Sequence, residues 1–379
     1  MSYLDTQDDL NKLCGLLIDA DYICVDTEFL RERTFFPQLC LVQLGIPKKG
    51  TIDTYAVDPL GKLDLKLLFE ILTSDKLLIF HSGKQDLEII YNLTGKLPSN
   101  VFDTQIAAMV CGFGEQVSYQ ELVREFCGTE IDKSQRYTDW SKRPLSERQI
   151  EYALADVKHL PEIHRLLSKS IDTDERKIWL QEEDSRLVDP ENYKDNPEDA
   201  WERIKHRDKK NSHLGVLQQV AKWRDDKARE SDKPRRWVMK DESLIEIALR
   251  KPQTVDDLKN IRNIGSLNKG FVTEIIKAVK TGLDMPKDQI PRLKKRPQKT
   301  PDSGVLDLLK LLFKAKCAEA GVAPKLMGTS EEIEKLALGD GAHFKTGWRY
   351  DIFGQYAEKL LAGELSFSVD AKTGKLLIK

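Results

Sequence analysis

Short apolar runs alternate with helical patterns in the first two hundred residues of the chain. The apolar runs have the length of strands and lie at residues 22–25, 39–44 and 76–80. Apolar positions recur at a spacing near 3.6, as on one face of a helix, over residues 63–72, 86–93, 104–110 and 147–167. Strands that come first and helices that follow them predict an α/β domain with a mixed sheet flanked by helices.

The rest of the chain has a different pattern, in which every recognisable element is helical. The predicted helices lie at 213–229, 241–250, 254–260 and 269–281, then at 305–320, 330–338 and 350–362, before a short polar tail. Two polar stretches with prolines, 188–199 and 284–301, predict linkers. We therefore expect an α/β domain at 1–204 and two all-helical domains at 210–289 and 302–379.

Composition narrows the class of protein. A hydrophobic share of 40% and a charged share of 32% over 379 residues are typical of a globular protein. No apolar run approaches the roughly 20 residues of a membrane helix. The N-terminal segment MSYLDTQDDLNKLCGLL is acidic where a secretory signal is basic, so we expect a cytoplasmic protein without a membrane partner. The six cysteines form no CxxC pair, and we expect neither disulfides nor zinc.

The net charge of −2 conceals an uneven distribution of charge. Lysine and arginine are frequent at 203–240 and 292–299, and Trp223 and Trp237 lie within the first of these stretches. A basic stretch by itself is most often a solvated helix face, and acidic neighbours dilute this one. It supports nucleic-acid binding only beside a site that handles phosphates.

Asp26 and Glu28 are the first candidates for chemistry, because they lie two residues apart at the end of a predicted strand. Residues two apart in a strand point to the same face, so the sequence Asp-Thr-Glu places two carboxylates side by side. Two carboxylates in this arrangement, without other signals, usually mark a strand end that is exposed to solvent. A divalent ion such as Mg²⁺ or Mn²⁺, which prefers oxygen ligands, would equally satisfy both carboxylates.

Two further carboxylates follow the strand at 76–80. Asp86 comes after a turn that contains His81 and opens a predicted helix, where an acidic residue also has an ordinary stabilising role. Asp103 lies at another helix start, and we predict that it is an N-cap. Asp156 shares one face of a later helix with Tyr152, because the two are four residues apart.

Each of these signals is weak alone, but the ordered set predicts a two-metal nuclease. Four carboxylates that come together can hold two metal ions about 3.5–4 Å apart, which activate water and stabilise a leaving 3′ oxygen. The phenol of Tyr152 is a poor base at neutral pH, so we assign it to positioning the water.

The strings VDTEFLRERTFFPQLCLVQLG, IFHSGKQDLEII, FDTQIAAMVCGFG and DKSQRYTDWSKRPLSERQIEYALADVKHL resemble the DEDD nuclease superfamily, in its tyrosine-bearing branch, and within it the ribonuclease D family. The resemblance covers about the first two hundred residues and implies a ribonuclease H-like fold and 3′→5′ exonuclease activity on RNA. It implies that the metal ligands are Asp26, Glu28, Asp86 and Asp156, and that Tyr152 completes the catalytic set.

The first helical segment resembles an HRDC domain, with VLQQVAKWRDDKARESDKPRRWVMKDESLIEIALRKPQTVDDLKNI as the best-matching string. The family resemblance implies that 302–379 is a second, more divergent HRDC-like domain. It also implies maturation of transfer RNA 3′ ends and trimming of other structured RNAs with single-stranded 3′ ends, and we expect the chain to act as a monomer.

An exonuclease must also hold the terminal nucleotide. Phe29 is the first candidate to stack the last base, because it directly follows the carboxylate pair, and Phe35 and Phe36 lie nearby in sequence. Thr27 and His81 are further candidates for contacts to that nucleotide. For any one of the aromatic residues, a place in the core is the commoner role.

Two other functions remain open on the sequence alone. A DNA 3′→5′ exonuclease of the same superfamily would use the same carboxylates, although the chain has no P-loop and no polymerase or helicase signature. A catalytically inactive RNA-binding scaffold would keep the fold, but such proteins usually lose a metal-binding carboxylate, and all four are present.

Overall fold

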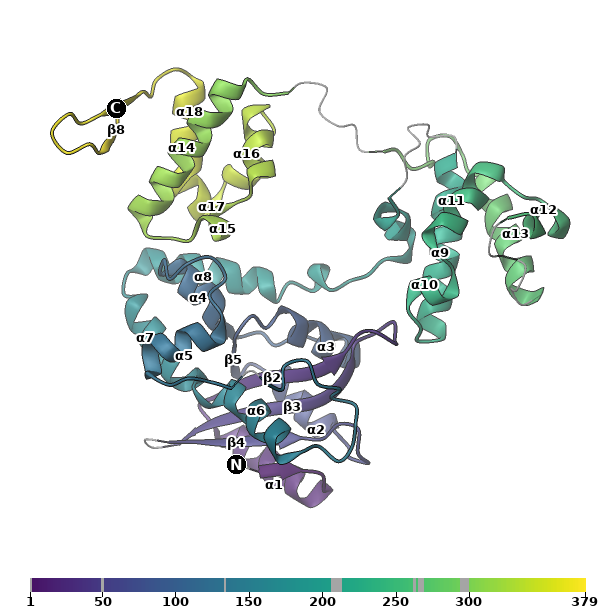
Figure 1. The fold of residues 1–379 in the computed structure, drawn as a ribbon, viewed down its shortest axis with the longest axis horizontal. Coiled ribbons are helices and arrows are strands. Elements are labelled where there is room, and N and C mark those ends of the chain that lie inside the picture. The colour runs from purple at the N-terminus through teal and green to yellow at the C-terminus, as the bar shows by residue number, and fades with distance from the viewer. Residues whose placement is uncertain are drawn as a thin grey trace. The chain divides into compact units, whose positions relative to one another are not determined.

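The computed structural model describes residues 2–48, 51–132, 134–205, 213–261, 264, 269–293 and 300–379. The chain divides into two compact units (Figure 1). The first comprises Met1–Glu28, Cys40–Asn192 and Pro297–Lys379, and the second comprises Phe29–Leu39 and Tyr193–Arg296. The segments that carry the four predicted metal-binding carboxylates therefore belong to the same unit as the C-terminal helices.

A six-stranded mixed sheet forms the centre of the first unit. Its strands, in chain order, are β1 (Ser2–Leu4), β2 (Tyr22–Leu30), β3 (Gln38–Lys48), β4 (Thr51–Val57), β5 (Leu77–Phe80) and β6 (Val101–Asp103). The order across the sheet is β1-β4-β3-β2-β5-β6. β5 runs parallel to both β2 and β6, whereas β3 and β4 are antiparallel. The predicted mixed sheet is confirmed, and β2 lies near its middle.

Eight helices accompany these strands within the described residues. They are α1 (Gln7–Asp19), α2 (Lys66–Leu72), α3 (Lys84–Thr94), α4 (Thr104–Val110), α5 (Tyr119–Cys127), α6 (Glu147–Lys158), α7 (Leu160–Ser170) and α8 (Asp174–Leu187), with a 3₁₀ turn η1 (Pro190–Asn192). The apolar spacing predicted α2, α3, α4 and the stretch of α6 and α7, and it missed α1, α5 and α8. The prediction of one helix over 147–167 was wrong, because the helix breaks at His159. Pro161 lies in the first turn of α7, where its missing N–H is tolerated, but in a helix interior it would interrupt the hydrogen bonding.

The C-terminal segment adds a second helical layer to this unit. Its elements are α14 (Ser303–Ala320), α15 (Pro324–Met327), α16 (Ser330–Ala337), η4 (Ala342–Phe344), α17 (Gly347–Arg349), a π-helical turn η5 (Tyr350–Gly354) and α18 (Gln355–Leu361), then β7 (Phe367–Val369) and β8 (Leu376–Ile378). β7 and β8 pair antiparallel, so the prediction of a plain polar tail was wrong. A Cβ on Gly354 would overlap the carbonyl oxygen of Phe344, which explains the glycine.

One continuous apolar core joins these helices to the α/β part of the unit. Buried side chains of α4, α7 and α8 belong to the same cluster as Leu309, Phe313 and Met327 of the C-terminal segment. Arg176 of α8 donates a hydrogen bond from Nη2 to the carbonyl oxygen of Ala320 at 3.0 Å. The C-terminal helices are therefore fixed to α8 by apolar packing and by hydrogen bonds.

The second unit is a helical bundle. Its elements are η2 (Pro197–Arg203), α9 (Leu214–Glu230), α10 (Arg235–Val238), α11 (Asp241–Arg250), α12 (Val255–Lys259) and α13 (Lys269–Leu283). Leu217, Val220, Ile247 and Val279 are buried in its core. The helical pattern predicted α9 and α11 to α13 within a few residues, and it missed the four-residue helix α10.

A short segment from the α/β half of the sequence also belongs to this second unit. The carboxylate of Asp232 accepts hydrogen bonds from the backbone N–H groups of Phe35 and Phe36 at 3.0 and 3.1 Å. The guanidinium carbons of Arg229 and Arg235 lie 4.8 and 4.3 Å from the centroid of the Phe35 ring. The helical bundle therefore holds the loop that follows β2.

Carboxylates neutralise much of the predicted basic stretch in the helical bundle. Arg229 Nε lies 3.0 Å from Asp225 Oδ2, and Arg224 Nη1 lies 2.5 Å from Asp241 Oδ1. These pairs favour a structural role for the arginines involved. Residues 206–212 of this stretch, and 294–299 of the second basic stretch, lie outside the described residues.

Within the part of the chain that the structure describes, no helix combines the length and the apolar character that crossing a membrane requires.

Candidate active site

Three of the four predicted metal-binding carboxylates come together at the end of β2. One carboxylate oxygen from each of Asp26, Glu28 and Asp156 lies within 4.8 Å of the others. Asp26 and Glu28 extend from the same face of β2, and Asp156 comes from α6, more than one hundred residues later in the chain. The strand β2 and the helix α6 thus bring their carboxylates to the same place.

Asp86 lies beside this group, in the first turn of α3. Its Oδ1 accepts a hydrogen bond from Thr27 Oγ1 at 2.5 Å, and both side chains are buried. Its negative charge raises the pKa of both Asp26 and Glu28, which places it within electrostatic reach of the pair. The structure therefore brings all four predicted carboxylates to one site.

The turn between β5 and α3 determines where Asp86 lies. The carboxylate of Asp103 accepts hydrogen bonds from the backbone N–H groups of Ser82 and Gly83 at 3.1 and 2.8 Å. A Cβ on Gly83 would lie 2.5 Å from the Cβ of Phe80, so only glycine fits this turn. Asp103 also caps α4, which confirms the predicted N-cap, and its second role in the turn was not predicted.

Burial and mutual repulsion make these carboxylates weak acids. Burial first, and then the charges of Asp156 and Asp86, raise the pKa of Glu28 to about 9. Burial raises the pKa of Asp156 to about 7 and that of Asp86 to about 6, and the Thr27 hydroxyl partly offsets the shift at Asp86. The pKa of Asp26 rises well above its usual range for the same reasons. Like charges held this close favour a bound cation.

The donor set fits a hard divalent ion. Every candidate ligand at this site is a carboxylate oxygen, and the donors lie close enough to share an ion. Oxygen donors of this kind are preferred by Mg²⁺, Mn²⁺ and Ca²⁺, whereas zinc sites usually contain histidine or cysteine. The site therefore has the character of a divalent-metal site.

Tyr152 lies on α6 one turn before Asp156 and is half-buried. Its ring centroid is 6.1 Å from that of Trp140, which is buried. Burial, followed by the charges of Asp156 and Glu28, raises its pKa above the usual value, so the phenol stays protonated at neutral pH. A protonated phenol donates a hydrogen bond, which suits the positioning of a water molecule.

Tyr119 of α5 is a supporting residue that sequence reasoning missed. Its hydroxyl donates to the carbonyl oxygen of Ala155 at 3.0 Å and accepts the backbone N–H of His159 at 3.1 Å. These two bonds bracket Asp156 and fix the last turn of α6. No local pattern around Tyr119 could have revealed them, because they join residues 36 and 40 positions apart.

The three predicted nucleotide contacts have different surroundings. Thr27 is buried, and its hydroxyl is bonded to Asp86. His81 lies 3.0 Å from the hydroxyl of Thr104 through Nδ1, and burial lowers its pKa, so the ring is neutral. Phe29 follows Glu28 in β2 and is half-buried, with the guanidinium carbon of Arg31 5.7 Å from its ring centroid.

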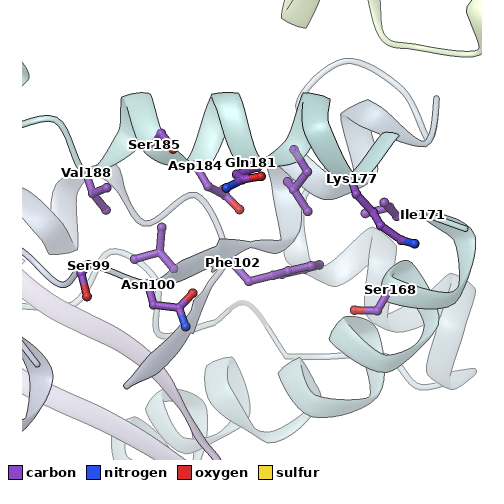
Figure 2. Close-up of a pocket in the computed structure, with 12 residues that line it drawn as sticks. Ser99, Asn100, Phe102, Ser168, Ile171, Lys177, Gln181, Asp184, Ser185 and Val188 are labelled. Atoms are coloured by element: carbon purple, nitrogen blue, oxygen red, sulfur yellow. The ribbon is translucent and has the colours of Figure 1, made fainter. Parts of the chain in front are cut away.

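A hollow of about 490 Å³ lies between β6, α7 and α8 (Figure 2). Asp184 extends from α8 toward Phe102 of β6, and Gln181 and Asn100 also line the hollow. Its lining contains none of the predicted site residues. It is therefore separate from the carboxylate group.

Two family models match this chain. A 3′–5′ exonuclease model matches residues 1–172, and an HRDC domain model matches residues 213–279. The first match contains all four carboxylates and Tyr152. The second lies within the helical bundle.

Curated relatives match over almost the whole chain. Ribonuclease D of Bartonella henselae is 43% identical over 379 residues, which cover 97% of this chain and 91% of that protein. Ribonuclease D of Jannaschia sp. is 41% identical and covers 99% of this chain and 98% of that protein.

A solved structure also matches over almost the whole chain. The crystal structure of Escherichia coli RNase D, an exoribonuclease involved in structured RNA processing, aligns with a TM-score of 0.79 at 30% identity. The alignment covers 95% of this chain and 98% of the E. coli chain. By sequence and by fold, this chain belongs to the ribonuclease D family and is a 3′→5′ exoribonuclease.

Proposed function

We propose that this exoribonuclease hydrolyses RNA from the 3′ end with two divalent ions, Mg²⁺ or Mn²⁺, held by the four clustered carboxylates. The proposed metal ligands are Asp26, Glu28, Asp86 and Asp156, and the proposed catalytic set adds Tyr152. The observation that carries this proposal is the approach of three carboxylates within 4.8 Å, beside a fourth and one helical turn from a protonated tyrosine.

The protein's own residues have separate tasks in this reaction. When bound, two such ions activate a water molecule and neutralise charge on the phosphate and on the leaving 3′ oxygen. Tyr152 donates a hydrogen bond that orients the attacking water, and its raised pKa excludes it as a general base near neutral pH. Thr27 holds Asp86 in place through its 2.5 Å hydrogen bond.

The terminal nucleotide is held by residues next to the carboxylates. We assign base stacking to Phe29, since it is partly accessible and adjoins Glu28. His81 and Thr27 are further candidates for contacts to this nucleotide. Because the hydroxyl of Thr27 is already bonded to Asp86, orienting that carboxylate is the task that its geometry favours.

The physiological substrates that we propose are transfer RNA precursors and other structured RNAs with single-stranded 3′ ends. The E. coli relative is described as an exoribonuclease involved in structured RNA processing, and it shares its fold with nearly all of this chain. We further propose that the chain acts in the cytoplasm as a monomer.

The proposed domains are the exonuclease domain at 1–204, an HRDC domain at 210–289 and a second, divergent HRDC-like domain at 302–379. Support for the last comes from its helices α14 to α18, which follow one another with short connections. Its apolar side chains share a core with α4 and α8, so we expect it to be stable only together with the exonuclease domain.

A labelled RNA tests the proposed reaction. The substrate carries a 5′ label, a duplex stem and a single-stranded 3′ tail, and a DNA of the same sequence serves for comparison. We expect stepwise shortening from the 3′ end with magnesium, none with chelator and none with Asp26→Asn. Asp19→Asn, which changes an exposed carboxylate at the end of α1, is the matched control and should be fully active.

Two outcomes would contradict the proposal. Equal rates on the DNA and the RNA would remove the preference for RNA. If the protein binds the RNA but does not shorten it with any divalent ion, the chain is a catalytically inactive RNA-binding scaffold.

A further inference from the structure

The loop that leads into α6 is firmly attached at several points. Gln149 Nε2 donates a hydrogen bond to Thr138 Oγ1 at 3.0 Å, which ties the loop to the first turn of α6. Trp140, two residues further on, is buried beside Tyr152. The backbone near residue 138 is therefore fixed relative to the helix that carries Tyr152 and Asp156.

The end of this loop is fixed as well. Arg143 Nη2 donates to Asp58 Oδ1 at 2.7 Å and to the carbonyl oxygen of Cys40 at 2.6 Å. Its Nη1 donates to the carbonyl oxygen of Trp140 at 2.8 Å. Arg143 thus uses its guanidinium to attach the loop to the sheet.

Arg136 and Tyr137 stand out from this anchored loop. The side chain of Tyr137 is 90% exposed, and the guanidinium carbon of Arg136 lies 5.4 Å from its ring centroid. Apart from this contact, neither side chain has a hydrogen bond or ion pair with any residue that the structure describes. An exposed arginine stacked on an exposed ring offers both a positive charge and a flat apolar face to solvent.

Arg136 lies close in sequence to the points that attach this loop to α6. Thr138 is bonded to Gln149 in the first turn of α6, and the ring centroid of Trp140 is 6.1 Å from that of Tyr152. Asp132, the nearest described acidic residue before it in sequence, is bonded to Ser134. Arg136 is thus a cation that lies near the proposed catalytic residues and is free to bind an anion.

We propose that Arg136 and Tyr137 bind the RNA strand next to the catalytic site, Arg136 through a backbone phosphate and Tyr137 by stacking on a base. The inference rests on the proposed function, because it assigns these residues to the same substrate. Arginine binds phosphate with paired N–H donors, and exposed aromatic rings stack on the bases of single strands without selecting a sequence. Neither residue touches the reacting atoms in this assignment.

The alternative role is structural, with the stacked pair stabilising only its own loop. The two roles predict different results, because a structural pair would change thermal stability and leave RNA affinity unaltered. Both side chains are exposed, so their removal should leave the melting temperature unchanged if they serve to bind RNA.

The experiment compares Arg136→Ala, Tyr137→Ala and Tyr137→Phe with wild type in the full-length protein. A labelled single-stranded oligoribonucleotide is used for Kd, by fluorescence anisotropy in chelator, and for KM and kcat with magnesium. Arg124→Ala, which removes an exposed arginine of α5, is the matched control.

We expect Arg136→Ala and Tyr137→Ala to raise Kd and KM by about tenfold and to leave kcat nearly unchanged. Arg136→Ala should also reduce the slope of log Kd against log salt by about 0.7, whereas Tyr137→Ala should not. Tyr137→Phe keeps the ring and should match wild type, as should Arg124→Ala.

Unchanged Kd and KM in both alanine variants of an active enzyme would overturn the inference and leave the proposed function standing. A lower melting temperature with unchanged affinity would assign the structural role instead. Failure of the proposed function itself would show in the wild-type protein, as an absence of metal-dependent shortening, and the inference would fall with it.

Discussion

Arg349 donates two hydrogen bonds to the carboxylate of Glu183, from Nη1 to Oε1 at 2.7 Å and from Nη2 to Oε2 at 3.0 Å. Both side chains are buried. Glu183 lies on α8 and Arg349 on α17, so the pair joins the exonuclease part to the C-terminal helices. Trp348 Nε1 adds a third bond to Glu183 Oε1 at 3.1 Å.

Removing Glu183 should destabilise the first unit severely. Glu183→Ala leaves the guanidinium of Arg349 bonded to the carbonyl oxygens of Leu326 and Met327 but without its carboxylate. Removing one partner of a buried ion pair costs about 3–5 kcal/mol. Chemical denaturation followed by tryptophan fluorescence measures the loss. Glu175→Ala removes an exposed acid from the same helix and should cost little. If the two variants unfold at the same denaturant concentration, the pair has no such role.

The metal-free protein should become less stable as pH rises. The folded-state pKa values of Asp86, Asp156 and Glu28 are raised to about 6, 7 and 9. In the unfolded chain these groups lose their protons near pH 4, so the folded state binds more protons above that pH. The contribution of these groups to the free energy of unfolding is therefore fully present below about pH 4. It is lost as pH rises through their folded-state pKa values.

Magnesium should remove this pH dependence, because a bound cation stabilises the ionised carboxylates. We therefore expect the rise in melting temperature on adding magnesium to be larger at about pH 8.5 than at about pH 6. Differential scanning fluorimetry measures this rise at each pH. Asp156→Asn should weaken both the pH dependence and the magnesium effect, and an equal rise at both pH values would contradict the assignment of the site.

Tyr152→Phe should separate catalysis from binding. The change removes only the hydroxyl that positions water, so kcat should fall by about 10²-fold while the RNA Kd and the magnesium effect on melting temperature stay the same. Rapid-quench kinetics and anisotropy measure the two quantities. A weaker Kd with normal kcat would instead make Tyr152 a substrate-binding residue.

The carboxylate site was predictable because its signals are local. Asp26 and Glu28 share a face by strand geometry, and Tyr152 and Asp156 by helix geometry. The sequence could not reveal the bonds of Tyr119 to α6 or the second role of Asp103, since both depend on how distant elements pack. Local spacing in the sequence identifies the functional side chains. The hydrogen bonds that hold them in place depend on contacts between distant segments.

The fold was likewise predictable where its signals are local and not where it depends on contacts between distant segments. The apolar runs predicted β2, β3 and β5, whereas β1, β4 and β6 were missed. β1 and β6 have three residues each and form by pairing with β4 and β5. The helices of the C-terminal segment were predicted, whereas their shared core with the α/β part was not. Apolar spacing shows which face of a helix is buried, but it does not show what buries that face.

Asp232→Ala should release the loop that follows β2 from the helical bundle. The substitution removes the acceptor of the Phe35 and Phe36 N–H groups, and one hydrogen bond contributes about 1 kcal/mol. Hydrogen exchange in a peptide covering residues 31–37 should therefore become about fivefold faster. Asp226→Ala, which changes an acidic residue of the preceding helix α9, is the control. Equal protection of this peptide in both variants would show that Asp232 does not hold the loop.

Asp184 should make stability fall as pH rises from about 4 to about 9. Burial, followed by the charge of Asp103, raises the pKa of Asp184 to about 9, so this carboxyl is protonated in the folded protein at neutral pH. Its contribution to stability is therefore present at low pH and is lost as pH rises through about 9. Asp184→Asn keeps the shape but cannot ionise, so its advantage over wild type in free energy of unfolding should grow as pH rises from about 4 to about 9 and stay constant above that pH. Denaturation curves of both proteins at about pH 5 and about pH 9 measure the difference. If the difference does not change between these pH values, the pKa of Asp184 is not raised in the folded protein.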